Sequence, residues 1–228
     1  MAFTLRLFAV GRAPKMGRPE QAMHRNPVEV HGPSLRMAWA VWIVVSIVGA
    51  VLAALAAWQV RTLLGAGPPF TSQSARYAAT VVEALITGGA QWLVLRRYRL
   101  AVDWWVPVSI AANLVNAIAV IPTVLRFAEG TGIISPPAAM IAGAAALAAA
   151  GLVVGAAQAL VLRGPAGNTA WAWVPATAIG SAFAGALTTA LSVQLFGLPY
   201  VMFISVLTAA GALLIAASQA PVFLRVIR

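Results

Sequence analysis

Glu83 is the residue of this chain best placed for chemistry, because it is a carboxylic acid inside an apolar run from about residue 77 to residue 95. An ionisable side chain within a bilayer is costly, so it is by default a candidate for binding a proton, a cation or a polar solute. On a helix that turns about 100° per residue, the polar residues at offsets of 4, 7, 11 and 15 share one face. This face consists of Arg76, Thr80, Glu83, Thr87 and Gln91.

A second polar face lies on the next apolar run, where three residues share one side of the predicted helix. Counting inward from the loop that joins the two runs places Ser109 opposite Gln91, Asn113 opposite Thr87 and Asn116 opposite Glu83. Two helices joined by a short loop pack antiparallel, so the sequence predicts a polar seam between them. Two hypotheses stay open: the seam carries a proton, cation or solute, or a neutral glutamate is hydrogen-bonded to asparagine for structural reasons. The polar seam consists of Glu83, Thr80, Thr87, Asn113, Asn116 and Ser109.

A short pattern of small residues, a glutamine, an apolar run and an arginine occurs three times, around Gln91, Gln158 and Gln219. The glutamines are 67 and 61 residues apart, and each lies one to two helical turns from the end of its run. They are therefore expected at one depth of the membrane. The three amides could form a ring, or each could bond a neighbouring helix, with a gain of about 0.6 to 2 kcal/mol per bond.

The composition predicts that these residues are positioned by membrane-spanning helices. Hydrophobic residues make up 61% of the 228 residues and charged residues 9%, whereas soluble proteins have roughly a quarter charged residues. A bilayer core about 30 Å thick requires about 20 apolar residues per helix. Six such runs, at about 38–60, 77–95, 104–125, 138–162, 171–195 and 200–220, predict an all-α polytopic membrane protein.

The six runs form three similar pairs, each expected to end in the glutamine pattern. Each pair crosses the membrane twice, so the pairs have one orientation and are predicted to be parallel repeats around a pseudo-threefold axis. The repeats cover about 37–99, 100–166 and 167–228, and a flexible basic tail covers 1–36. Tryptophan beside proline opens two of the runs, and the amphipathic indole ring is expected at the membrane interface. These tryptophans are Trp104, Trp105, Trp171 and Trp173.

The net charge of +10 is explained by membrane topology without a nucleic-acid partner. The tail, the loops after the second and fourth runs and the C-terminus hold 12 of the 15 lysines and arginines. Arg61, Arg76 and Arg126 lie on the other side. The positive-inside rule therefore predicts that both termini lie in the cytoplasm of a bacterium, with the helices in its inner membrane.

The residues that are missing limit the possible chemistry. The chain has no cysteine, both histidines precede the first run, and its one lysine is Lys15. These facts exclude thiolate chemistry and, within the bilayer, a histidine-ligated haem or a lysine Schiff base. A lone carboxylate is not a catalytic constellation, so we expect no enzyme, no metal and no cofactor.

The repeated glutamine with Val-Leu-Arg, followed by Trp-Val, resembles a pattern in uncharacterised bacterial multi-pass membrane proteins. The resemblance covers roughly residues 38–228 and concerns the repeat alone, so it implies no activity, cofactor or catalytic residue. Gly151 and Gly155 form a Gly-x-x-x-Gly motif. We expect it to serve packing within the bundle, and a homo-oligomer stays open.

The sequence therefore favours a non-enzymatic structural or accessory subunit of a membrane complex. The alternative is a small-solute, proton or cation transporter or channel that uses the polar seam. The expected partners are the lipid bilayer and, for the first hypothesis, other membrane subunits.

Overall fold

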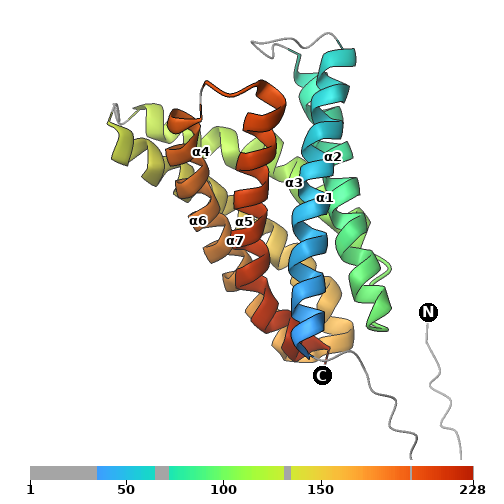
Figure 1. The fold of residues 1–228 in the computed structure, drawn as a ribbon. Helices are drawn as coiled ribbons and strands as arrows, with labels where there is room; N and C mark the ends of the chain where they lie inside the picture. The colour runs from blue at the N-terminus through green and yellow to red at the C-terminus, as the bar shows by residue number, and fades with distance from the viewer. Residues whose placement is uncertain (1–34, 65–71, 131–134, 196, 228) are drawn as a thin grey trace, which may run out of the picture. The chain divides into compact units, whose positions relative to one another are not determined.

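The computed structural model describes residues 35–64, 72–130, 135–195 and 197–227, which belong to one unit, Pro33–Arg228. The predicted basic tail lies outside these residues, except for its last two, which begin the first helix. Every secondary-structure element of the described residues is helical, so the predicted all-α class is confirmed (Figure 1). The α-helices are α1 (Leu35–Leu63), α2 (Gln73–Arg97), α3 (Trp105–Val115), α4 (Ile121–Gly130), α5 (Pro136–Ala166), α6 (Trp173–Gln194) and α7 (Tyr200–Val226).

Two short elements connect these helices. A π-helical turn, η1 (Asn116–Val120), joins α3 to α4, and a 3-10 helix, η2 (Gly167–Ala172), joins α5 to α6. Each predicted repeat range therefore contains one pair of long helical segments, namely α1 with α2, α3–η1–α4 with α5, and α6 with α7.

Five segments of the described residues are long and apolar enough to cross a membrane, as in a multi-pass membrane protein. One of them, Pro136–Ser192, has 57 residues and contains both α5 and α6. A straight helix of that length would extend about 85 Å, far more than a bilayer core of about 30 Å. Instead α5 and α6 pack antiparallel, as two contacts show. Near η2, a Cβ on Gly155 would lie 3.1 Å from the Cα atom of Val174, and at the other end of the pair Gly143 contacts Gly185.

The observed helices are longer than the predicted runs at several ends. The first run, expected at 38–60, extends over Leu35–Leu63. The last, expected to stop near residue 220, continues through Pro221 to Val226. Val222 and Phe223 are buried, and this packing holds the final turns in place despite the proline.

The third run has an irregularity that the sequence did not predict. Pro122 has no N–H group for the carbonyl oxygen of Ile118, and its ring would clash with that carbonyl in a regular helix. The helix widens instead, and the N–H group of Ile121 bonds the carbonyl oxygen of Asn116 five residues earlier. Such π turns are frequent at functional sites, and this one begins at a residue of the polar seam.

The helices are arranged as a closed ring. Each long helical segment packs against its neighbours in the sequence, and α7 also packs against α1 (Figure 1). Close contacts support this packing, since a Cβ atom on Gly49 of α1 would lie 2.8 Å from the Cβ of Ala90 in α2. The Gly151 and Gly155 motif faces α6, so its predicted role in packing within the bundle is confirmed.

One end of the ring is filled by aromatic side chains that meet from four different helices. Trp42, Trp105 and Trp173 are fully buried there. The rings of Trp42 and Trp105 lie 5.4 and 5.8 Å from that of Trp173 in edge-on geometry, and Phe223 stacks on Trp42 at 4.8 Å. We call these four residues the aromatic cluster.

Trp105 and Trp173 pack against each other inside the bundle, whereas their neighbours Trp104 and Trp171 are 70% and 43% exposed. Burial between helices does not specify depth in a bilayer, so the interface position of these tryptophans stays a prediction.

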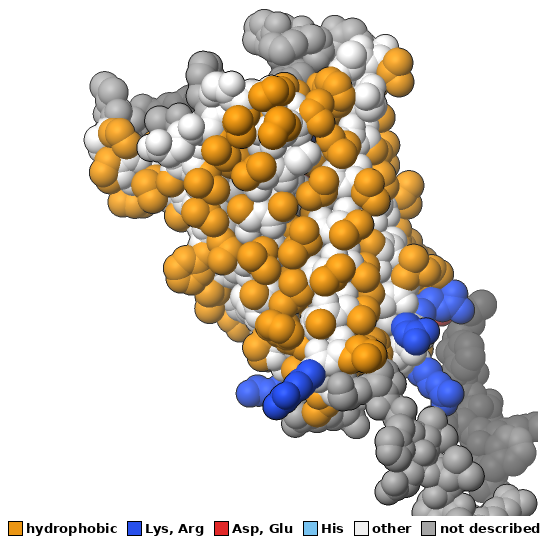
Figure 2. Space-filling model, viewed as in Figure 1, with side chains coloured by type: hydrophobic (Ala, Val, Ile, Leu, Met, Phe, Trp, Pro, Cys, Tyr) orange, Lys and Arg blue, Asp and Glu red, His pale blue; other side chains and the backbone are white. Residues whose placement is uncertain are grey.

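The two ends of the bundle differ in charge. Most of the described basic residues lie at the end that carries the aromatic cluster, which we call the basic end. Figure 2 shows the basic side chains of one face gathered at one end. The other end, the vestibule end, carries three basic residues on α1, α2 and α4. The basic end carries Arg36, Arg96, Arg97, Arg99, Arg163 and Arg225, and the vestibule end carries Arg61, Arg76 and Arg126.

Candidate functional site

A cavity of about 410 Å³ lies between the helices, and residues of α2, α3, η1, α4, α5, α6 and α7 line it. We call it the central cavity. The structure brings to its wall all six residues of the predicted polar seam and all three repeated glutamines. These nine residues are Thr80, Glu83, Thr87, Ser109, Asn113, Asn116, Gln91, Gln158 and Gln219.

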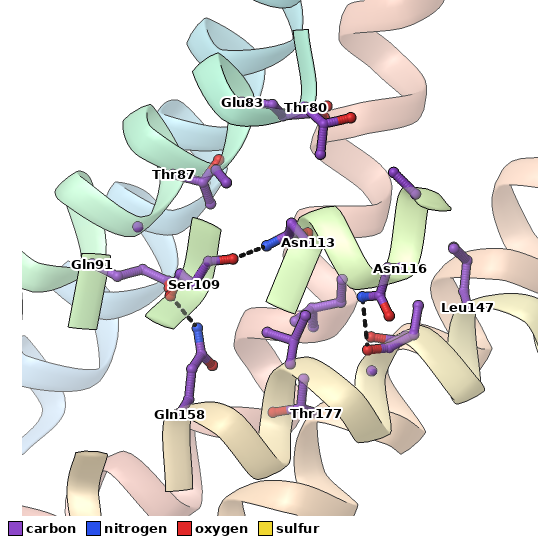
Figure 3. A pocket seen from close by; sticks show the side chains of 18 of the residues that line it. Thr80, Glu83, Thr87, Gln91, Ser109, Asn113, Asn116, Leu147, Gln158 and Thr177 are labelled. Carbon is purple, nitrogen blue, oxygen red and sulfur yellow. Dashed lines mark hydrogen bonds between the residues drawn. The ribbon is translucent and has the colours of Figure 1, made fainter. Parts of the chain in front are cut away.

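The polar face of α2 forms one side of the central cavity, with Thr80, Glu83, Thr87 and Gln91 following each other along the helix (Figure 3). Glu83 is half-buried and also lines a neighbouring cavity of about 500 Å³, which extends between α1, α6 and α7. Glu83 is the one carboxylic acid among the residues that line these two cavities. The described residues contain no group of three His, Cys, Asp or Glu side chains that could hold a metal ion.

The opposite wall is formed by α3 and η1, and its two asparagine side chains donate hydrogen bonds to backbone carbonyl groups. Asn113 donates from Nδ2 to the carbonyl oxygen of Ser109 at 2.8 Å, and Asn116 donates from Nδ2 to that of Ala150 at 3.1 Å (Figure 3). The Oδ1 atom of Asn116 is buried and has no hydrogen-bond partner. A buried acceptor without a partner costs about 1–3 kcal/mol, so it favours a ligand or water that donates a hydrogen bond.

Gln158 links three helices beside the aromatic cluster. Its Oε1 accepts a hydrogen bond from Nε1 of Trp173 at 2.9 Å, and its Nε2 donates to Oγ of Ser109 at 3.1 Å. Gln219 behaves similarly, since its Nε2 donates to Oγ1 of Thr177 at 2.9 Å. These two glutamines therefore bond neighbouring helices, as the second interpretation of the repeated glutamines expected.

Thr177 and Ser181 also line the central cavity, although they were not predicted from the sequence. A signal for them exists in the spacing from the buried tryptophans. Thr177 and Ser181 follow Trp173 by four and eight residues, as two seam residues follow the tryptophan of the preceding repeat. Ser46 follows Trp42 by four residues in the same way and is also buried.

The lining of the central cavity includes the three glutamines, and Gln158 bonds Trp173 of the aromatic cluster at the basic end. Toward the vestibule end the central cavity adjoins a cavity of about 650 Å³, because Thr80, Ala117 and Ile121 line both. Thr80 is the polar residue common to both cavities.

No protein-family model, curated protein or solved structure matches the chain. We therefore infer the function from the geometry of the cavities and the chemistry of their walls.

Proposed function

We propose that the chain crosses the membrane six times, as three parallel two-helix repeats around a pseudo-threefold axis. Equivalent residues support this proposal. A buried tryptophan is followed after four residues by a hydroxyl residue in each repeat, at Trp42, Trp105 and Trp173. In the second and third repeats this hydroxyl group accepts a hydrogen bond from the repeat's own glutamine.

The unpaired buried atoms mark where the symmetry-related hydrogen bonds are not formed. Rotation by one repeat would carry the Trp173–Gln158 bond onto a bond between Trp42 and Gln219. Both Nε1 of Trp42 and Oε1 of Gln219 are buried without a partner. The same rotation would pair Nε1 of Trp105 and Oγ of Ser46 with the amide of Gln91, and these two atoms are also unpaired.

We further propose that the protein lies in a bacterial inner membrane with its basic end in the cytoplasm. The distribution of arginines between the two ends supports this orientation. A single cysteine at Gln73 should react with an impermeant maleimide added to intact cells, whereas one at Asn168 should react only after lysis. Both positions are exposed, and Asn168 is preferred to Gly167, whose φ of 57° would strain a cysteine. Labelling of Asn168 in intact cells would refute the orientation.

We infer that the protein is a carrier for a small polar solute, which binds in the central cavity after entering from the vestibule end. One observation carries this inference: side chains from six helical elements place a carboxyl group, amides and hydroxyls around one cavity in an otherwise apolar bundle. Polar residues in membrane helices are costly and typically line substrate pathways. An accessory subunit would not need a polar cavity, so the cavity favours the transport hypothesis over the accessory-subunit hypothesis.

The change Glu83→Gln tests the carrier. An amide keeps hydrogen bonding but cannot release a proton or hold a negative charge, so we expect solute flux to fall at least tenfold with thermal stability unchanged. Flux would be followed by light scattering from proteoliposomes shrinking and swelling against gradients of neutral polar solutes, amines and organic anions.

Asp103→Asn is the matched control, since Asp103 is an exposed acid outside the central cavity. It should retain full flux. If the wild-type protein moves none of these solutes, or if Glu83→Gln is fully active and equally stable, the carrier proposal fails and the accessory role is preferred.

A further inference from the structure

The cavity at the vestibule end, of about 650 Å³, is lined by basic residues from three elements. We call it the vestibule. Arg61 belongs to the last turn of α1, Arg76 to the first turn of α2 and Arg126 to α4. These are all of the described basic residues at this end of the bundle. Segments that lie apart in the sequence thus bring their guanidinium groups to one hollow.

The rest of the vestibule wall suits an anion. Gln73 contributes an amide and Tyr77 a phenol, both able to donate hydrogen bonds, and no carboxylic acid lines the vestibule. The nearest acid among the cavity-lining residues is Glu83, beyond Thr80 in the central cavity. Glu83 interacts electrostatically with Arg61, and Glu129 follows Arg126 by three residues in α4. Two carboxyl groups do not balance three guanidinium groups, so an excess of positive charge remains at this end.

Arginines at the ends of membrane helices commonly extend to lipid headgroups, and this role requires no common cavity. Here the three residues share one, and Arg61 is only partly exposed. Guanidinium groups bind carboxylates and phosphates through paired, charge-assisted hydrogen bonds. A compact anion would relieve the mutual repulsion of the three cations.

We propose that the vestibule is a binding site for a carboxylate- or phosphate-bearing anion, held by Arg61, Arg76 and Arg126. The proposal deepens the proposed function, because it makes a small organic anion the preferred solute. It concerns binding, however, and does not require that the protein transport what it binds.

Binding can be measured on the full-length protein purified in a detergent with an uncharged headgroup. The probes are inorganic phosphate, citrate and phosphatidylglycerol, added at constant ionic strength with chloride as the background anion. We expect at least one probe to raise the unfolding temperature with saturation. The apparent Kd should weaken at least tenfold in Arg76→Gln and in Arg126→Gln.

Arg163→Gln and Arg225→Gln are the matched controls, since they remove exposed arginines at the basic end and should leave the Kd unchanged. Arg76→Lys keeps the charge without the paired geometry and should weaken binding less than Arg76→Gln. This graded loss of affinity would distinguish weaker anion binding from poor folding of a variant.

The probes distinguish the source of the anion. Binding of phosphate or citrate supports a site open to water, whereas binding of phosphatidylglycerol alone supports the same site filled by a lipid headgroup. If no probe binds, or if the basic-end controls lose as much affinity as the vestibule variants, the proposal is overturned. Anion binding that persists without flux would separate this site from the carrier proposal.

Discussion

Replacing Gln158 by leucine should lower the free energy of unfolding by about 3 kcal/mol. The change removes two side-chain hydrogen bonds, to Trp173 at 2.9 Å and to Ser109 at 3.1 Å. An interhelical hydrogen bond in a membrane protein contributes about 0.6 to 2 kcal/mol, and each buried polar atom left unpaired costs about 1–3 kcal/mol. Unfolding of the purified protein in mixed detergent micelles, followed by tryptophan fluorescence, would measure the loss.

The equivalent glutamines make this experiment a test of the threefold repeat. If the repeats are equivalent, Gln91→Leu and Gln219→Leu should also destabilise the protein, and Gln219→Leu should cost less than Gln158→Leu because only Nε2 of its two amide atoms is bonded, to Thr177. Gln59→Leu is the control, because Gln59 is exposed on α1, and its replacement should change stability by less than about 0.5 kcal/mol. A silent Gln91→Leu would contradict the equivalence of the first repeat with the second.

Gly185→Ala should be still more damaging, with a loss of about 3 kcal/mol or more. A Cβ atom on Gly185 would meet the backbone carbonyl group of Gly143 in α5, lying 2.7 Å from its carbon atom, and would lie 3.1 Å from the Cα of Ala144. Backbone atoms cannot move aside as a flexible side chain can, so α5 and α6 would have to separate. Overpacking typically costs 1–3 kcal/mol, and helix separation would add to it.

Gly89→Ala is the matched control for this experiment. Gly89 also lies within a helix, but a Cβ atom there would have nothing within 4 Å. Alanine is the better helix former by about 0.5–1 kcal/mol, so this variant should be equally or more stable. If Gly185→Ala unfolds at the same denaturant concentration as Gly89→Ala, the close approach of α5 and α6 is refuted.

The parts of the structure that could be predicted are those with a local signal. Apolar runs predicted the long helices, and the helical period placed Glu83 and its polar neighbours on one face. The repeated motif put Gln91, Gln158 and Gln219 at one depth. The helical period gives the side of the helix on which a residue lies, and the repeat gives its height along the helix. Residues predicted to share both line a single cavity in the structure.

The parts that could not be predicted depend on contacts between distant segments. An indole ring suits an interface and a core equally well, and only the closing of the helix ring buries Trp105 and Trp173. Pro122 signals an irregular helix, but it does not say whether the helix bends, ends or widens into a π turn. Thr177 was missed because a hydroxyl residue in an apolar run is common and carries little information by itself.

The closing contact between α1 and α7 has a consequence for biosynthesis. Trp42 stacks on Phe223, although the two residues are 181 positions apart in the sequence. At the 5–20 residues per second of ribosomal synthesis, roughly 10 to 35 s separate the emergence of the two rings. During that interval one flank of α1 faces lipid, while neighbours such as α5 and α6 meet soon after they are made. The ring therefore closes only after the last helix has inserted, and a nascent chain that stops before α7 would leave Trp42 without its aromatic partner.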